Sequence, residues 1–362
     1  MMADVVKLAL IGCGDVAQRD YLPEMHRLAD RAEFVAVCGR SPERARDVAA
    51  RYEIPAWYDD LDRMLAESDA DAVINLTPIQ EHTHTTLAAL RAGKHVYSEK
   101  PVATSLDDAR SIRDEASRRG LTLVCAPSVL LFPQVRYARE VVAGGKLGTV
   151  HAALGRGYGG VPPWSGYPSD PSPFFARGGG PLADMGVYPL HAITGILGPV
   201  RRVSAFAAQA QRDFVVADGP FSGRRVPIEV PDNWHLMLDF GDGRFASVTA
   251  NNVAQSSRAP QMELFGLGGT IAVDLLDVSA PVETWLPDTG WSSRVIPHER
   301  TAGPDHLLGV EHLVECLKTG AQPLPSIDHA VHVIEIMEAA AESAASGRVV
   351  DLGTTFGQQD QV

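Results

Sequence analysis

Over the first third of the chain, short apolar runs rich in β-branched residues alternate with segments whose apolar residues recur at helical spacing. The apolar runs predict strands at Val6–Ile11, Phe34–Cys38, Ala72–Leu76, His95–Ser98 and Thr122–Val124. The periodic segments predict helices at Glu43–Tyr52, Thr85–Ala92 and Leu106–Arg119. Because parallel strands need long crossover connections, this alternation predicts an α/β domain with a doubly wound parallel sheet.

The pattern changes beyond Pro127. A helical segment at Gln134–Ala143 is followed by Gly155–Pro181, which is rich in Gly, Pro and aromatic residues. So many helix and strand breakers predict a long loop. Long loops inside compact domains are often functional, so this segment is a candidate part of a binding site.

Polar and apolar residues alternate singly over residues 200–285, which predicts antiparallel strands. Gly241-Asp242-Gly243 stands between two such runs and predicts a hairpin turn. Two helical segments, Leu307–Lys318 and His329–Ala345, follow near the C-terminus.

The length of 362 residues corresponds to about two domains of typical size, and an apolar share of 45% gives each a buried core. The change of pattern divides the chain into an α/β domain over residues 1–126 and an α+β domain over residues 127–362. We expect a large, mostly antiparallel open sheet in the second domain. The closing helices are able to pack back on the first domain.

The formal net charge of −13 argues against nucleic acid and anionic membrane surfaces as partners. No apolar stretch approaches the roughly 20 residues that span a bilayer. The residues before Val6 carry an acid where a signal peptide is basic, so we expect a cytoplasmic protein. The four cysteines form no CxxC pair and no HExxH motif occurs, so we expect reduced thiols and no metal.

A glycine-rich turn follows the first predicted strand and opens a predicted helix. Gly12 permits a tight turn, Gly14 lets a pyrophosphate approach the backbone, and the small Ala17 allows close helix packing. With Asp15 and Val16 between them, these residues predict the cofactor loop of a Rossmann domain. The alternative is a glycine turn in an α/β domain that binds no nucleotide.

The end of the second predicted strand bears on the choice between NAD and NADP. An acid for the ribose 2′-hydroxyl is usual there in NAD-binding domains, but this chain has Arg40 and Ser41. A guanidinium and a hydroxyl can hold a 2′-phosphate, and Arg44 can assist from the following helix. We therefore expect NADP ahead of NAD. The alternative is that Arg40 is a solvated turn residue or lies on the adenine.

Further motifs follow in order along the chain. They are Asn75-Leu-Thr77-Pro78 with His82, Ala92-Gly-Lys-His-Val96, Glu99-Lys100-Pro101, and Gly178-Gly-Gly180-Pro-Leu-Ala-Asp184-Met-Gly186-Val-Tyr188. Together with the glycine loop, their order and spacing resemble the Gfo/Idh/MocA oxidoreductases, which include glucose–fructose oxidoreductase and inositol dehydrogenase. The resemblance implies that residues 1–126 bind NAD(P). It also implies that residues 127–362 bind substrate and form a homodimer or homotetramer.

The resemblance also implies catalytic roles. In the family, the lysine of the Glu-Lys-Pro motif lies beside the nicotinamide and the reacting hydroxyl, a role that falls here to Lys100. Tyr188 stands where most members carry histidine, but a smaller group, resembling glucose–fructose oxidoreductase and dimeric dihydrodiol dehydrogenase, carries tyrosine and leans towards NADP. Tyr188 is therefore the expected general acid/base, with Lys100 favouring its phenolate. Asp184, placed on the same helical face, would bind a substrate hydroxyl or orient the pair.

The remaining implied site residues flank these groups. We expect Glu99 near the nicotinamide ribose and His191 at the substrate, one helical turn beyond Tyr188. After the predicted strand Ala72–Leu76, Thr77 and Pro78 are expected to bind the cofactor, and His82 is expected to have a local structural role or to pack beside the cofactor.

The substrate class is inferred from two segments. Pro127–Phe132 is apolar where many relatives have an arginine-bearing segment, which favours a neutral substrate. Trp164 and Tyr167 in the long loop offer aromatic faces that suit the C–H face of a pyranose or cyclitol, although aromatic residues also anchor long loops.

The sequence thus predicts an NAD(P)-dependent oxidoreductase that transfers a hydride between nicotinamide and a secondary hydroxyl or ketone of a neutral sugar, cyclitol or related polyol. One alternative is a redox-neutral enzyme of the same family that cleaves glycosides with permanently held NAD. Others are a non-catalytic sensor that binds a dinucleotide and a reductase acting on a flat apolar substrate, resembling biliverdin reductase. Retention of the acid/base pair argues against the sensor.

Overall fold

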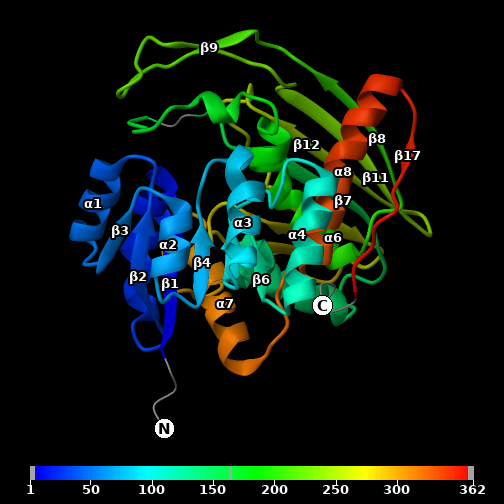
Figure 1. The fold of residues 1–362 in the computed structure, drawn as a ribbon. Coiled ribbons are helices and arrows are strands. Elements are labelled where there is room, and N and C mark those ends of the chain that lie inside the picture. Colours follow the sequence, from blue (N-terminus) through cyan, green and yellow to red (C-terminus); the bar gives the residue numbers. More distant parts are fainter. Residues whose placement is uncertain (1–4, 161, 163–164, 358–362) are drawn as a thin grey trace.

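The first domain is built on a six-stranded parallel sheet in the order β3-β2-β1-β4-β5-β6, as the computed structural model of residues 5–160, 162 and 165–357 shows (Figure 1). Its strands are β1 (Val6–Ile11), β2 (Ala32–Cys38), β3 (Ala56–Tyr58), β4 (Ala72–Asn75), β5 (His95–Ser98) and β6 (Leu123–Cys125). Its helices are α1 (Pro42–Arg51), α2 (Leu61–Glu67), α3 (His82–Arg91) and α4 (Leu106–Arg119). The predicted doubly wound sheet is confirmed. The strand order reverses between β1 and β4, where sheets of this kind bind dinucleotides.

The sequence pattern missed β3 and α2. β3 has three residues, with Trp57 partly exposed, and α2 has seven residues. Elements this short contain too few apolar positions to establish a period.

The segment after the glycine loop is not a regular α-helix. η1 (Ala17–Tyr21) is π-helical and η2 (Leu22–Leu28) is 3₁₀-helical. Pro23 lacks an amide hydrogen, so it cannot donate to the carbonyl one α-helical turn earlier. The wider π turn buries both Asp20 and Tyr21.

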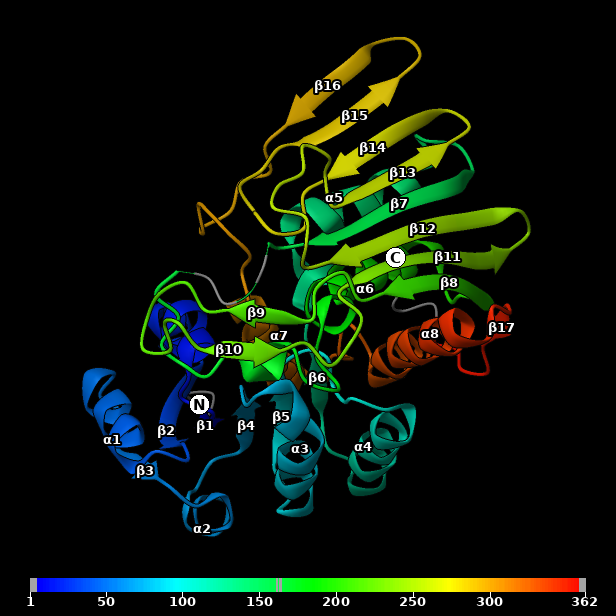
Figure 2. The same ribbon diagram turned by 90° about the horizontal axis from the view of Figure 1, so that it is seen from above.

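The second domain is built on a nine-stranded sheet in the order β16-β15-β14-β13-β7-β12-β11-β8-β17 (Figure 2). Its strands, in chain order, are β7 (Val150–Tyr158), β8 (Arg202–Ala208), β11 (Asn233–Gly241), β12 (Arg244–Asn251), β13 (Met262–Gly266), β14 (Gly269–Val273), β15 (Val282–Leu286), β16 (Gly290–Arg294) and β17 (Val350–Asp351). β7 and β12 pair in parallel and the other neighbours pair antiparallel. The predicted hairpin through Gly241-Asp242-Gly243 is confirmed as β11 and β12.

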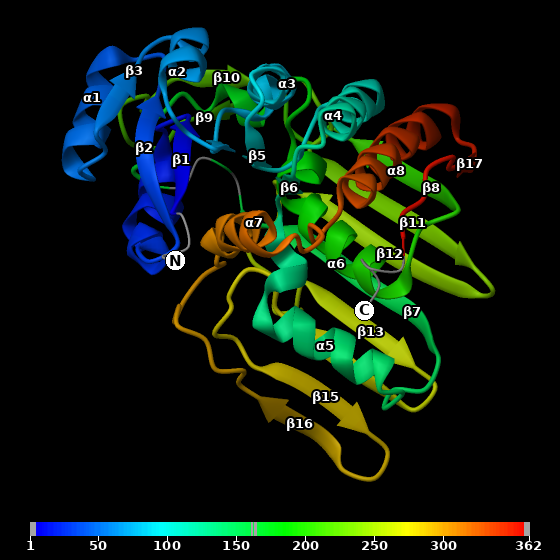
Figure 3. The ribbon, with the colours of Figure 1, turned by 60° about the horizontal axis from the view of Figure 1, so that its bottom comes forward.

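Helices cover one face of this sheet (Figure 3). α5 (Pro133–Ala143) packs on β14, α6 (Val187–Leu197) packs on β7, and α8 (Ile327–Ser346) packs on β8. α6 is buried along its whole length, because it lies between the sheet and the helices α5 and α8. The opposite face of the sheet is turned toward the viewer in Figure 2, where no described helix covers it.

The predicted loop Gly155–Pro181 begins later than expected. Its first residues complete β7. Gly157 lies so close to the backbone of Gly186 that a Cβ atom at Gly157 would clash with it. Further along the loop, Phe174 and Phe175 pack against a short arm formed by β9 (Asp213–Val215) and β10 (Arg225–Pro227). The loop and the arm lie over the edge of the six-stranded sheet (Figures 1 and 2).

Both closing helices contact the first domain. α7 (Leu307–Thr319) shares a hydrophobic cluster with Leu8 and Leu10 of β1. α8 shares another with the opposite face of the same sheet, through Ala330, Val331 and Ile334. Among the described residues, no helix is long and apolar enough to cross a bilayer.

Candidate active site

The glycine loop at the end of β1 leaves room for a ligand. Gly12 has a φ of +94°, and a Cβ atom there would lie 2.5 Å from the Leu76 carbonyl oxygen. A Cβ atom at Gly14 would meet no protein atom within 4 Å, whereas Ala17 is fully buried. The tight turn at Gly12 and the open space at Gly14 therefore fit the pyrophosphate of a dinucleotide.

The predicted NADP contacts lie at the end of β2. Arg40 is exposed and forms no hydrogen bond or ion pair with the described residues, so it is available to a ligand. Ser41 caps α1, because its hydroxyl accepts the Arg44 amide hydrogen at 3.3 Å. The Arg44 guanidinium donates to the Ser169 hydroxyl at 3.3 Å. This contact joins the loop of the second domain to the turn where the adenosine end of a cofactor would lie.

Asp15 and Val16 lie at the start of the irregular helix. The Asp15 carboxylate pairs with Arg19, and Val16 packs at the margin of the cluster around β1. Burial raises the pKa of Asp15, against the opposing charge of Arg19. Neither side chain is fully buried, so both border the open space beside Gly14.

A hydrogen-bond network fixes the turn after β4. The Asn75 amide nitrogen donates to the Thr85 and Thr86 hydroxyls, and its oxygen accepts from the Thr77 hydroxyl at 2.7 Å. Pro78 is exposed beside this turn. The sequence identified Asn75 only as part of a motif and did not predict that its side chain holds this turn together.

His82 links two turns that border the site. One ring nitrogen lies 2.7 Å from the Pro101 carbonyl oxygen and the other lies 2.8 Å from the Thr77 carbonyl oxygen. A neutral imidazole can donate to only one of these acceptors. Burial lowers the pKa of His82. The side chain thus forms a structural link between the turns after β4 and β5.

Lys100 lies just beyond β5, at the carboxyl edge of the sheet. Its Nζ donates to Asp184 Oδ1 at 2.6 Å and to the Asp184 carbonyl oxygen at 2.7 Å. The same Nζ lies 5.3 Å from the centroid of the Tyr188 ring. The structure therefore brings together the three predicted catalytic residues, which come from different domains.

Asp184 and Tyr188 do not share the regular α-helix that the sequence predicted. η6 (Leu182–Gly186) is π-helical, and α6 begins at Val187. The wider turn carries both the Asp184 carbonyl oxygen and its carboxylate to Lys100. Asp184 Oδ2 is buried and has no hydrogen-bond partner among the described residues, so it can accept from a bound hydroxyl.

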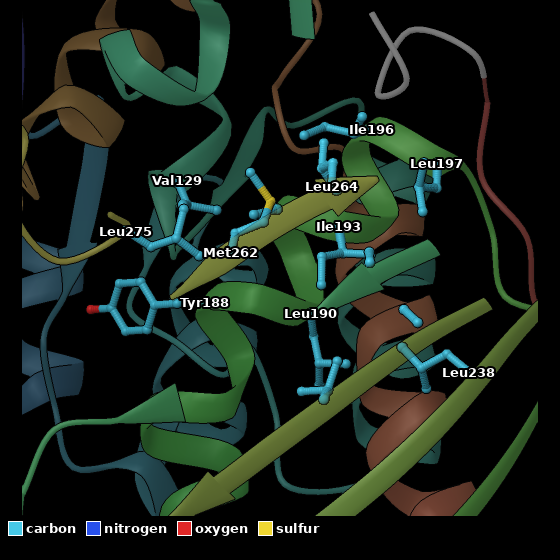
Figure 4. Close-up of a cluster of buried hydrophobic side chains, with 14 of the residues drawn as sticks. Val129, Tyr188, Leu190, Ile193, Ile196, Leu197, Leu238, Met262, Leu264 and Leu275 are labelled. Carbon is cyan, nitrogen blue, oxygen red and sulfur yellow. The ribbon is translucent and has the colours of Figure 1, made fainter. Parts of the chain in front are cut away.

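Burial dominates the electrostatics of Tyr188. Burial raises its pKa well above the ordinary value, and the charges of Glu99 and Asp184 act in the same direction. The Lys100 ammonium pairs with Asp184, and the expected stabilisation of the phenolate by Lys100 stays a prediction. Tyr188 is thus a neutral phenol, and Figure 4 shows its hydroxyl directed away from the surrounding hydrophobic cluster.

Glu99 is held by protein groups on both carboxylate oxygens. Oε2 accepts the Lys100 amide hydrogen at 2.9 Å, and Oε1 accepts from the Tyr21 hydroxyl. Sequence reasoning missed Tyr21, because nothing in a π-helical turn's local pattern identifies a partner 78 residues away. The predicted position of Glu99 near the nicotinamide ribose stays a prediction.

The substrate loop is described only in part. Trp164, a predicted substrate contact, lies outside the described residues. The Tyr167 ring packs edge-on against Phe174 at 5.6 Å. Burial, with the charges of Asp15 and Asp184, raises the pKa of Tyr167 to about 12. Tyr167 thus senses a charge of the cofactor loop and one of the catalytic residues, and its predicted contact with a substrate stays a prediction.

Two other predictions about the substrate side stay untested. Val129, Leu130 and Phe132 of the apolar segment Pro127–Phe132 are fully buried in the core of the second domain. The segment brings no arginine to the substrate side, so the expected neutral substrate stays a prediction. His191 is also buried, 4.9 Å from the His329 ring, and burial lowers its pKa to about 3. Its surroundings in the described residues are those of a neutral interior side chain.

The fold and this site define a class of protein, an oxidoreductase with a nucleotide-binding Rossmann domain. A model of the oxidoreductase family with an NAD-binding Rossmann fold matches residues 6–126. A model of the GFO/IDH/MocA C-terminal domain matches residues 135–272. The chain belongs to the Gfo/Idh/MocA family of oxidoreductases, as its sequence motifs predicted.

The chain is similar to two named relatives and to one solved structure. D-glucoside 3-dehydrogenase of Escherichia coli is 32% identical over 58% of this chain and 59% of its own length, so that match spans little more than half of the relative. Trans-1,2-dihydrobenzene-1,2-diol dehydrogenase of Sus scrofa is 28% identical over 83% of this chain and 85% of its own. Aldose–aldose oxidoreductase of Caulobacter crescentus, solved with glycerol, has the same fold, with a TM-score of 0.80, 23% identity and coverage of 96% and 100%.

Proposed function

We propose that this protein catalyses NADP-linked interconversion of a secondary hydroxyl and a ketone on a neutral sugar, cyclitol or related polyol. One observation carries the proposal. The Lys100 ammonium, the neutral Tyr188 phenol and the unpaired Asp184 Oδ2 converge at the carboxyl edge of β5, beside the open glycine loop.

The three side chains divide the work at the reacting carbon. A bound nicotinamide supplies or accepts the hydride. Lys100 and Tyr188 are both donors, so together they stabilise the alkoxide that develops as a ketone is reduced, and the Tyr188 phenol delivers the proton. In the oxidation direction the same oxygen takes the proton back. Asp184 orients Lys100 through Oδ1 and binds a neighbouring hydroxyl of the substrate through Oδ2.

A neutral polyol suits the charges of this cleft. Lys100 pairs with Asp184, and Arg19 pairs with Asp15 and Asp20, so both cations near the Tyr188 ring already have carboxylate partners. The relatives named for glucoside and aldose chemistry support the same substrate class. The edge-on pair of Tyr167 and Phe174 offers apolar surface for the C–H face of a ring.

The direct test is nicotinamide absorbance with purified protein, NADP or NAD, and a panel of neutral sugars, inositols and glycosides. Net reduction of NADP by one sugar class supports the proposal. Aglycone release from a glycoside without net reduction would favour the redox-neutral alternative. Bound cofactor without turnover of any substrate would favour the sensor.

Arg40→Ala tests the cofactor preference. Loss of a charge-assisted contact with the 2′-phosphate is expected to raise the Kd for NADPH about tenfold or more, with the Kd for NADH nearly unchanged. Fluorescence titration of both cofactors measures the two constants. Arg46→Ala, an exposed arginine further along α1, is the matched control. Equal weakening of NADPH and NADH binding would instead place Arg40 on the adenine.

We further propose that two copies of the chain associate through the open face of the nine-stranded sheet. The strand register places four aromatic residues in one cross-strand row over that face: Phe245, Phe265, Trp285 and Trp291. Phe206 and Met237 lie on the same face and are 81% and 51% exposed. A face of this kind can pair with itself about a two-fold axis, which gives a homodimer and, with a second contact, a homotetramer.

Phe245→Asp, at the β12 end of this row, is expected to shift the chain to monomers because it places a charge in the apolar interface. Light scattering after size exclusion measures the mass. Leu267→Asp, which is equally apolar and 79% exposed but lies in the β13–β14 turn, should leave the assembly intact. A wild-type chain that is already monomeric would remove this proposal.

A further inference from the structure

Tyr21 is a fully buried phenol that none of the steps above uses. It is the last residue of η1, the π-helical turn that follows the cofactor loop. Its hydroxyl donates to Glu99 Oε1 and lies 2.9 Å from the Tyr97 hydroxyl. The His306 ring stacks on it, at 6.0 Å and 20° between planes. The phenol therefore has a fixed position and one anionic partner.

Glu99 links Tyr21 to the catalytic lysine. Its second oxygen accepts the Lys100 amide hydrogen, and the Lys100 ammonium in turn donates to Asp184. A continuous set of hydrogen bonds thus runs from the helix of the cofactor loop to the groups that we assign to proton transfer. All members of the set are buried or nearly so, and water does not compete strongly for these bonds.

We propose that Tyr21 is a positioning residue for Lys100, acting through the carboxylate of Glu99. This inference rests on the proposed function, since it assigns Lys100 to the reaction. The hydroxyl of Tyr21 fixes the carboxylate in one rotamer and keeps it ionised beside the reacting groups. With the hydroxyl absent, the carboxylate loses a donor and the backbone turn that carries Lys100 loses a restraint.

The charge state of Glu99 depends on groups from several elements. Burial acts to raise its pKa, but His306, Lys100 and the Tyr21 hydroxyl together hold it below the ordinary value. The other titratable groups that interact with it come from β5, α3 and α6, namely Tyr97, His82 and Tyr188. Asp184 of η6 is reached only through Lys100. Because Tyr21 is the only side chain in the described residues whose hydroxyl donates to the Glu99 carboxylate, its removal should raise the pKa of that carboxyl.

Tyr21→Phe in the full-length enzyme tests the inference, with Tyr97→Phe as the matched control. Both substitutions delete one hydroxyl from a fully buried ring, but only the first removes a donor from Glu99. For Tyr21→Phe we expect kcat to fall about tenfold near neutral pH, with KM for the cofactor changed little. The acid limb of the kcat profile should move upward by about one pH unit, because Glu99 now takes up its proton at higher pH.

The pH profile separates positioning from simple stability. Both variants lose a buried hydrogen bond, so both should melt at a lower temperature. Tyr97→Phe should nevertheless keep the wild-type acid limb. An unshifted limb in Tyr21→Phe, or an equal shift in both variants, would overturn the inference.

A measurement without substrate distinguishes this result from failure of the proposed function. The fluorescence of bound NADPH, followed from acid to neutral pH, should report titration of Glu99 at a higher midpoint in Tyr21→Phe than in wild type. If the midpoint shifts but no sugar is turned over, Tyr21 controls Glu99 and the proposed function is wrong. If sugars are oxidised and neither the fluorescence midpoint nor the acid limb of kcat shifts in Tyr21→Phe, the proposed function is supported and the positioning role of Tyr21 is refuted.

Discussion

Lys100→Met is expected to abolish turnover, a fall of at least about 10³-fold, while NADPH still binds. The substitution removes the only ammonium beside the Tyr188 ring in the described residues, and with it the charge that stabilises a developing alkoxide. The cofactor loop around Gly12 and Gly14 is untouched. Turnover rate and cofactor affinity, measured on the same preparation, separate these two effects.

This variant also leaves the Asp184 carboxylate buried without its cation. Breaking a buried ion pair on one side costs about 3–5 kcal/mol, so Lys100→Met alone could lose activity by unfolding. The double variant Lys100→Met, Asp184→Asn removes the unpaired charge and should recover much of the melting temperature without recovering turnover. Lys318→Met, an exposed lysine of α7, controls for the loss of a surface charge. A folded Lys100→Met protein that still oxidises sugars would remove Lys100 from the mechanism.

Tyr188→Phe should lower kcat by about 10² to 10⁴, which is the usual contribution of a general acid or base. The ring remains in the hydrophobic cluster and under the Lys100 ammonium, and only the hydroxyl is lost. We therefore expect an unchanged KM for the cofactor and little change in melting temperature. Stopped-flow measurement of the hydride step keeps slow product release from hiding the effect.

The pH dependence of the same reaction gives an independent reading. A pKa raised above its ordinary value keeps the Tyr188 phenol protonated, so ketone reduction should not decline through its ionisation below about pH 10. Tyr137→Phe, on α5 and outside the site, is the control. A Tyr188→Phe rate within a few-fold of wild type would show that another group moves the proton.

The sequence predicted what local patterns determine. The apolar runs of β1, β4 and β5 match their predicted positions closely, because each is largely buried on both faces and so reads as a continuous apolar run. The hairpin between β11 and β12 was predictable because the glycines at its turn adopt positive φ values. The meeting of Lys100 with Asp184 followed from motifs, and the geometry agrees with it.

Other features depend on contacts that no local pattern encodes. The π-helical turns at η1 and η6 read as ordinary helix in sequence, although they decide where Tyr21 and Asp184 point. The sequence of the apolar segment around Val129 is compatible with a pocket lining and with a core, and in the structure the segment lies in a core. Burial of this kind is settled by the partner surface, which lies far away in the chain.

The packing of α7 against β1 has a consequence for biosynthesis. Leu307 and Val310 complete the apolar interior beside the first strand, yet they leave the ribosome long after it. Until then the nascent Rossmann sheet presents an uncovered apolar face, and it must await the last part of the chain or be shielded by chaperones. A fragment cut at residue 126 should accordingly aggregate when expressed alone, even though it holds every strand of its sheet.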